Sequence, residues 1–146
     1  MSKKLRDRAN SRGLNNGFSG NGYLGQKDLD LLAARLKKKL AYQLSKSGVE
    51  GVEDAPNVLN IVIKDAVPSR PTFEQLSRQT SLSFNSFGNG GATFEGTMTH
   101  NGEDAGVISY AWYETDITRT GGRGSTWYDA NYAIDRFSRK AGKSFR

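Results

Sequence analysis

The 146-residue chain contains no cysteine, a single histidine and no long hydrophobic run. The absence of cysteine excludes disulfide bonds, cysteine-based zinc sites and thiol catalysis. No window approaches the roughly 18 apolar residues that a membrane-spanning helix requires. The first residues are positively charged, but no apolar segment follows them as it would in a secretory signal peptide. We therefore expect a soluble chain without a targeting signal.

The sequence also lacks a recognisable catalytic or metal-binding cluster. His100 lies in a predicted turn beside Asn101 rather than among carboxylates, so neither a metal site nor a Ser-His-Asp arrangement can be drawn around it. Glu95 and Glu114 fall on neighbouring predicted strands and Asp116 lies near a strand end; acid–base chemistry would need such carboxylates within about 5–10 Å. Solvated strand charges are the simpler interpretation. We expect no enzyme activity and no cofactor, and a hydrolase is the third hypothesis.

Positive charge is concentrated in the first third of the chain. The formal net charge is +6, and residues 1–46 carry eleven Lys or Arg against three Asp. Residues 1–25 are rich in Asn, Gly, Arg and Ser, which predicts a flexible basic arm. Residues 20–25 match G-x-G-x-x-G, but the apolar strand that a dinucleotide-binding site needs upstream is missing. Residues 26–146 are predicted to form a single α+β domain.

Two segments have the apolar spacing of amphipathic helices. From residue 26 leucines recur at steps of three and four residues until Gly48 ends the pattern, and a second stripe opens behind Ser125 or Thr126. Asp129 stands where it would complete a capping box with Thr126. The first stripe is Leu29, Leu32, Leu36, Leu40 and Leu44, and the second is Trp127, Ala130, Ile134, Phe137 and Ala141.

The segment between the helices predicts strands. Residues 58–67 are rich in β-branched side chains and apolar on both faces, which is typical of a central strand. Pro68 and Pro71 stop this strand, because proline donates no ladder hydrogen bond. Residues 82–87 predict a second strand, and the glycines at 88–91 predict a turn or bulge after it.

The clearest strand signal is the alternation of residues 93–99, which predicts a half-exposed antiparallel strand. Its partner is predicted at residues 107–114, and the Asn-Gly pair within residues 100–104 predicts a hairpin between them. The order helix, four strands, helix predicts an α+β fold. We expect an antiparallel sheet of about four strands with an N-terminal and a C-terminal helix packed on one face.

Two groups of basic residues are candidate contacts for an anionic partner. Lys37, Lys38 and Lys39 lie away from the leucine stripe, where a solvated face is the alternative to binding phosphate or lipid headgroups. Arg119 and Arg123 flank two glycines in a segment similar to one copy of an RNA-binding RGG repeat, with a mobile loop as the alternative. A basic nucleic-acid-binding module is therefore the alternative function. Its further contacts would come from the arm, Lys3, Lys4, Arg6, Arg8 and Arg12.

Aromatic residues gather around the predicted hairpin and the last helix. Burial between sheet and helix is the plainer interpretation, and stacking on bases or sugars is the alternative. The group consists of Tyr110, Trp112, Tyr113, Trp127, Tyr128 and Tyr132.

A resemblance to a known family rests on residues 58–76, VLNIVIKDAVPSRPTFEQL. It is supported by Gly-Gly-Ala at 90–92, Trp-Tyr-Glu at 112–114, Thr-Trp-Tyr-Asp-Ala at 126–130 and Asp-Arg-Phe at 135–137. With these motifs the chain resembles a bacterial family of uncharacterised lipoproteins, over about residues 28–143.

Members of that family are exported by a signal peptide, lipidated on a cysteine and held in the Gram-negative envelope as small α+β domains without established activity. The resemblance implies a non-catalytic domain of the periplasm or outer membrane that acts by protein–protein contact or self-association. This chain lacks both the signal peptide and the lipidated cysteine. An envelope location therefore requires a signal peptide in the native precursor, and membrane contact requires a lipid anchor. An open sheet edge would favour strand addition.

Overall fold

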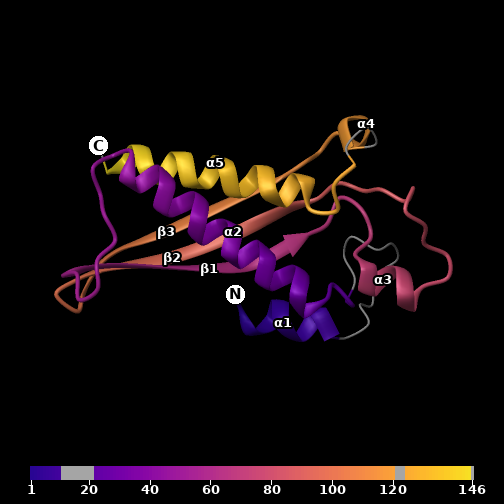
Figure 1. Cartoon of the computed structure of the whole chain (residues 1–146), viewed down its shortest axis with the longest axis horizontal. Helices are drawn as coiled ribbons and strands as arrows, with labels where there is room; N and C mark the ends of the chain where they lie inside the picture. Colours follow the sequence, from indigo (N-terminus) through magenta and orange to yellow (C-terminus); the bar gives the residue numbers. More distant parts are fainter. Residues whose placement is uncertain (11–21, 121–123, 146) are drawn as a thin grey trace.

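The computed structural model of the chain describes residues 1–10, 22–120 and 124–145. The elements in chain order are α1 (Lys3–Asn10), α2 (Gln26–Ser45), β1 (Asn57–Val67), α3 (Phe73–Arg78), β2 (Gly91–His100), β3 (Glu103–Tyr113), α4 (Ile117–Thr120) and α5 (Tyr128–Ser144). The strands form one antiparallel sheet in the order β1-β2-β3, and α2 and α5 pack against one face of it (Figure 1). The predicted α+β fold is confirmed.

The hydrophobic core lies between this face of the sheet and the two long helices. Leu29, Leu32 and Leu36 of α2 are buried, as their spacing predicts. Phe94 of β2 is 0% exposed, and its ring centroid lies 5.0 Å from that of Phe137 on α5. The period-two pattern of the strand and the helical pattern of α5 therefore meet at this aromatic pair.

The two long helices approach each other closely near the end of α5. A Cβ atom at Gly142 would lie only 2.8 Å from the carbonyl oxygen of Gln43, so glycine is required for this separation. Ser47, just after α2, donates a 2.6 Å hydrogen bond to the carbonyl oxygen of Gly142. This contact ties the C-terminal end of α5 to the end of α2.

Two of the strand predictions are wrong. Residues 82–87 form no strand, and Phe84 is 76% exposed. Serine hydroxyls in this segment accept hydrogen bonds from nearby backbone N–H groups. Such local hydrogen bonds compete with sheet pairing. Within the described residues the sheet consequently has three strands rather than four. Strand β1 lies at an edge instead of the centre, since β2 pairs with both β1 and β3.

The hairpin between β2 and β3 is longer than predicted. Its turn consists of Asn101 and Gly102 alone. Both have positive φ angles, 51° and 85°, which asparagine and glycine adopt more easily than other residues. His100 already pairs with Glu103, so β3 begins four residues before the predicted position 107. The Asn-Gly turn itself is confirmed.

Part of the segment predicted as a flexible arm is folded. Residues 3–10 form α1, and Leu5 and Ala9 are buried in the common core. The amide of Ser2 donates a 2.8 Å hydrogen bond to the carbonyl oxygen of Ile63 in β1. Helix α1 therefore lies along the outer side of β1 (Figure 1). Residues 11–21 lie outside the described residues.

Asp129 joins three segments that are distant in sequence. Its side chain is 0% exposed, and its Oδ2 accepts hydrogen bonds from the Ser69 hydroxyl at 2.8 Å and the Gly90 amide at 3.0 Å. The Asp129 amide donates in turn to Ser69 Oγ at 3.1 Å. The predicted capping box with Thr126 is wrong, because the Asp129 amide donates to Ser69 rather than to Thr126, and the residue that precedes α5 is Trp127, without a side-chain cap.

The motifs that carry the family resemblance meet at this junction. Ser69 belongs to the Pro-Ser-Arg-Pro motif, Gly90 to Gly-Gly-Ala and Asp129 to Thr-Trp-Tyr-Asp-Ala. A Cβ atom at Gly90 would lie 2.6 Å from the carbonyl oxygen of Val67, so the approach of the β1 and β2 ends requires glycine. The three motifs thus build a framework that closes the sheet onto α5.

Candidate functional site

Of the carboxylates considered for acid–base chemistry, Glu95 lies apart from Glu114. Glu95 pairs across the sheet with Ser109 and forms a 2.8 Å ion pair with Lys64. Glu114 follows Ser109 by five residues, a distance of about 16 Å along a strand. Its Oε1 accepts a 3.1 Å hydrogen bond from the Asp116 amide. In the described chain no group of three or more His, Cys, Asp or Glu residues could hold a metal ion.

The three lysines predicted as contacts for an anionic partner differ in their surroundings. Lys37 and Lys38 are exposed on α2. The Nζ atom of Lys39 instead lies 3.4 Å from the carboxylate of Asp135 on α5. Lys39 therefore helps to hold the two helices together.

Three of the other predicted basic contacts are engaged within the molecule, whereas Lys3 and Lys4 are exposed on α1. Arg119 lies 3.5 Å from the Asp116 carboxylate. Arg6 and Arg8 of α1 form ion pairs with Asp30 at 2.9 Å and Asp65 at 2.8 Å, respectively. Arg12 and Arg123 lie outside the described residues. The basic segment predicted from the sequence therefore serves, in part, to attach α1 to the domain.

A different group of cations lies along α5. Arg136, Arg139, Lys140 and Lys143 are spaced so that they share one helical face, and all are exposed. Within the described residues none of them forms an ion pair with a carboxylate. We call these residues the basic row. Its spacing is visible in the sequence, but the apolar stripe of the same helix is the stronger signal.

Aromatic side chains hold the basic row beside β3. Arg136 lies over the ring of Tyr132, 5.7 Å from its centroid, and Lys140 lies 5.7 Å from the ring centroid of Tyr110 on β3. Tyr132 packs edge-on against Trp112 of β3 at 4.7 Å. The predicted aromatic group is thus shared between packing and the surface.

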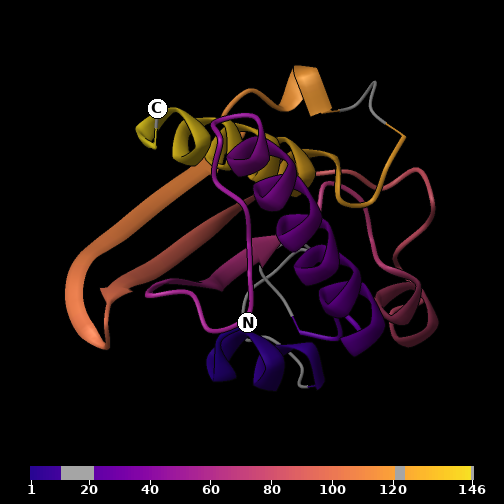
Figure 2. The same cartoon turned by 60° about the vertical axis from the view of Figure 1, so that its left-hand side comes forward.

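The outer edge of β3 has no strand beside it in the part of the chain that the structure describes (Figure 2). The amide of Glu114 donates to the carbonyl oxygen of Gly90 at 2.9 Å. Antiparallel pairs alternate in hydrogen bonding, so the backbone N–H and C=O groups of Val107, Ser109 and Ala111 point away from β2. Val107 is 80% exposed.

The opposite edge of the sheet is covered. The Ser2 amide and hydroxyl donate to the carbonyl oxygens of Ile63 at 2.8 Å and Lys64 at 3.0 Å. Arg8 donates to the carbonyl oxygen of Ala66 at 3.0 Å. Helix α1 and the residues before it therefore cover the β1 edge from Ile63 to Ala66, whereas no comparable contact covers the edge of β3 in the described part of the chain.

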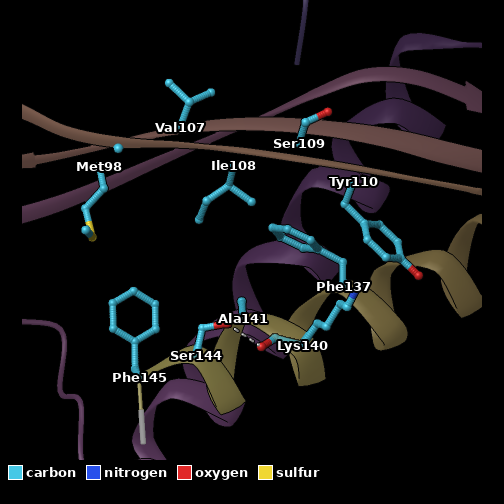
Figure 3. Close-up of a pocket in the computed structure, with 11 residues that line it drawn as sticks. Met98, Val107, Ile108, Ser109, Tyr110, Phe137, Lys140, Ala141, Ser144 and Phe145 are labelled. Carbon is cyan, nitrogen blue, oxygen red and sulfur yellow. Dashed lines mark hydrogen bonds between the residues drawn. The ribbon is translucent and has the colours of Figure 1, made fainter.

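A groove of about 360 Å³ lies between β3 and the C-terminal half of α5. Figure 3 shows Ile108 and Tyr110 pointing toward α5, whereas Val107 and Ser109 point away from it. Phe145 closes the groove at the end of the helix. The apolar walls are formed by Met98, Ile108, Phe137, Ala141 and Phe145. The groove and the open edge of β3 form one continuous candidate site.

Comparisons with known proteins give no match to this chain. No family model matches the chain, and neither a curated protein nor a solved structure matches it significantly. Among the residues that the structure describes, no helix combines the length and the apolar character needed to cross a membrane. The resemblance to envelope lipoproteins stays a prediction from sequence motifs.

Tyr113 anchors the end of β3 to the other two strands. Its hydroxyl donates to the Asp65 carboxylate at 2.8 Å and lies 2.9 Å from the Thr93 hydroxyl. Burial is the main reason that the pKa of Tyr113 is raised to about 12; the hydrogen bond with Thr93 lowers it, and Asp65 raises it. The folded chain therefore retains the phenol proton at a pH where the unfolded chain has lost it.

We expect the free energy of unfolding to decrease as the pH rises from about 10 to about 12, because the unfolded chain binds fewer protons there. Tyr113→Phe has no proton to lose, so it should lack this part of the slope. Urea unfolding at several pH values measures both slopes. Tyr42→Phe, on the exposed face of α2, keeps Tyr113 and should behave like wild type. Equal slopes in wild type and Tyr113→Phe would contradict the assignment.

Proposed function

We propose that this chain is a non-catalytic docking domain of the bacterial cell envelope, which binds an extended segment of a partner protein along the open edge of β3. The observation that carries the proposal is the difference between the two sheet edges. Helix α1 and Ser2 cover the C-terminal part of the β1 edge, from Ile63 to Ala66, whereas Val107, Ser109 and Ala111 of β3 direct their backbone groups outward without such a cover in the described residues. An unpaired edge is a template for a further strand.

A partner protein fits this edge better than a second copy of the chain does. Antiparallel pairing of two β3 strands would relate the copies by a two-fold axis perpendicular to the sheet. Both α5 helices would then lie on the same face of the joined sheet, beside the junction. The two basic rows would face each other, and like charges oppose such an arrangement.

The envelope location is supported by the motif resemblance. The motifs at 68–71, 90–92 and 126–130 build the Asp129 junction, which is a framework rather than a reactive site. Fractionation of cells that express the complete gene tests the location. We expect recovery with the periplasm or the membranes, and recovery from the cytosol alone would contradict this part of the proposal.

A nucleic-acid-binding module is the second candidate, and the basic row beside exposed tyrosines is the observation that favours it. Binding to phosphates would weaken steeply with salt, because counterions are released. A gel-shift titration at two ionic strengths measures this. Absence of a shift at low salt would remove this candidate.

Ser109→Pro tests strand addition directly. Proline at this position removes an N–H group that points away from β2, and edge strands tolerate proline where the N–H faces solvent. A photo-crosslinking residue placed at Val107 should yield one discrete protein adduct in cells. We expect Ser109→Pro to abolish this adduct and Ser109→Ala, which keeps the N–H group, to retain it.

Two controls accompany this experiment. Circular dichroism of Ser109→Pro establishes that the variant is folded, and Ala111→Pro removes a second outward N–H group in the same strand. The same crosslinker at Phe73, exposed on α3, should not give the Val107 adduct. An adduct from Val107 that persists in both folded proline variants would rule out strand addition along β3.

A further inference from the structure

We infer that the segment which docks along β3 is acidic, with carboxylates directed at the basic row and a neighbouring apolar side chain in the groove. This inference rests on the proposed strand addition and specifies the chemistry of the partner. It combines the open edge of β3, the groove beside it and the unpaired cations of α5.

The geometry of an added strand directs half of its side chains toward α5. Such a strand would run about 4.8 Å outside β3, and its successive side chains would alternate between the two faces of the sheet. Those on the α5 face would meet a surface hollow lined by Tyr110 and all four members of the basic row. Since these cations form no ion pair within the described residues, carboxylates on the added strand would be their first anionic partners.

The acidic residues of β3 indicate where along the strand the carboxylates of the partner segment would lie. Glu103 and Asp104 lie at the hairpin end of the strand and would repel an acidic side chain there. The basic row instead lies at the level of Tyr110, and the apolar groove lies between these two regions, beside Ile108. The partner segment should therefore place its carboxylates opposite Tyr110 and an apolar residue opposite Ile108.

The backbone hydrogen-bonding groups along the edge of β3 favour a polypeptide over a nucleic acid or a lipid as the bound molecule. The outward groups of Val107, Ser109 and Ala111 present alternating donors and acceptors, repeating about every 6.8 Å. A polypeptide backbone supplies a matching donor and acceptor at each repeat. Phosphate groups of a nucleic acid or a lipid supply acceptors alone, so they would leave the carbonyl groups of the edge unpaired.

Binding of synthetic probes to the full chain tests the inference. The probes are short fluorescent peptides in which threonine alternates with glutamate, glutamine or lysine, together with a short oligothymidylate. Anisotropy titrations at two ionic strengths measure each affinity. We expect the glutamate peptide to bind about tenfold more tightly than the glutamine peptide, with a loss of this advantage at high salt.

Two double variants with the same change in net charge separate the basic row from charge in general. Arg139→Glu combined with Lys143→Glu reverses two members of the row, and we expect it to weaken the glutamate peptide about tenfold. Lys37→Glu combined with Lys38→Glu reverses two exposed cations of α2, and its effect should be less than about twofold. Ser109→Pro should weaken both the glutamate and the glutamine peptide, whereas Ser109→Ala should not.

The possible results distinguish this inference from the proposed function. Equal binding of the three peptides with sensitivity to Ser109→Pro would overturn the acidic preference and leave strand addition intact. Glutamate-peptide binding that depends on Arg139 and Lys143 but not on Ser109 or Ala111 would overturn strand addition itself. Tighter binding of oligothymidylate than of any peptide, or no peptide binding, would overturn the inference in favour of a nucleic acid or of no acidic ligand at all.

Discussion

Replacing Asp129 with alanine is expected to lower the free energy of unfolding by about 3–5 kcal/mol, because it leaves buried donors without an acceptor. The hydroxyl of Ser69 and the amide of Gly90 both donate to Asp129 Oδ2, at 2.8 and 3.0 Å. Each buried donor left unpaired costs about 1–3 kcal/mol, and donors to a charged acceptor lie toward the upper end. The substitution also detaches the ends of β1 and β2 from α5.

Urea unfolding of three variants measures this effect. Asp129→Asn keeps one acceptor oxygen and should lose about 1–2 kcal/mol, less than alanine does. Asp30→Ala removes an exposed ion pair with Arg6 and should change stability by less than about 1 kcal/mol. If Asp129→Ala were no more destabilising than Asp30→Ala, the junction would not hold the three segments together.

Replacing Phe94 with alanine is expected to cost about 3–5 kcal/mol, the usual range for a fully buried aromatic side chain. Phe94 is 0% exposed at the centre of the sheet. Its ring lies 5.0 Å from that of Phe137 and 6.3 Å from that of Tyr110, measured between centroids. The cavity left by alanine would face α5 and β3 together, so neither element can close it alone.

Phe73→Ala is the matched control for Phe94→Ala, because Phe73 is 79% exposed on α3. Its removal should change the free energy of unfolding by less than about 0.5 kcal/mol. Chemical denaturation of both variants measures the difference. Similar losses in the two variants would mean that the core does not lie between β2 and α5.

The helices and the hairpin turn were predictable because their signals are local. The leucine spacing of α2 and the Asn101-Gly102 pair specify conformations within a few residues of themselves. Residues 82–87 were mispredicted because hydrophobic residues alone do not supply a pairing partner. Leu5 was missed for a related reason: α1 is short, and its burial comes from contact with the distant β1 and α2.

The candidate site was only partly predictable. The spacing of Arg136, Arg139, Lys140 and Lys143 is present in the sequence, although their lack of ion pairs in the described chain is a tertiary property. Lys39 shows the opposite case. The sequence places it on an exposed face of the helix, whereas the structure places it in an ion pair with Asp135. Charge patterns show where cations lie on a helix, and only packing shows which of them keep a partner.

The sequence by itself determined the α+β class, the amphipathic faces of α2 and α5 and the tight turn between β2 and β3, because each depends on periodicity or on the backbone freedom of a few adjacent residues. The tertiary structure decided the order of the strands and hence which edge stays open. The partial covering of β1 depends on Ser2 and Arg8 reaching that strand, and the attachment of the sheet to α5 depends on Asp129 reaching Ser69 and Gly90; all are contacts between residues far apart in the chain. No local pattern encodes such pairings, since the free energy that selects them comes from burial and hydrogen bonding in the assembled fold.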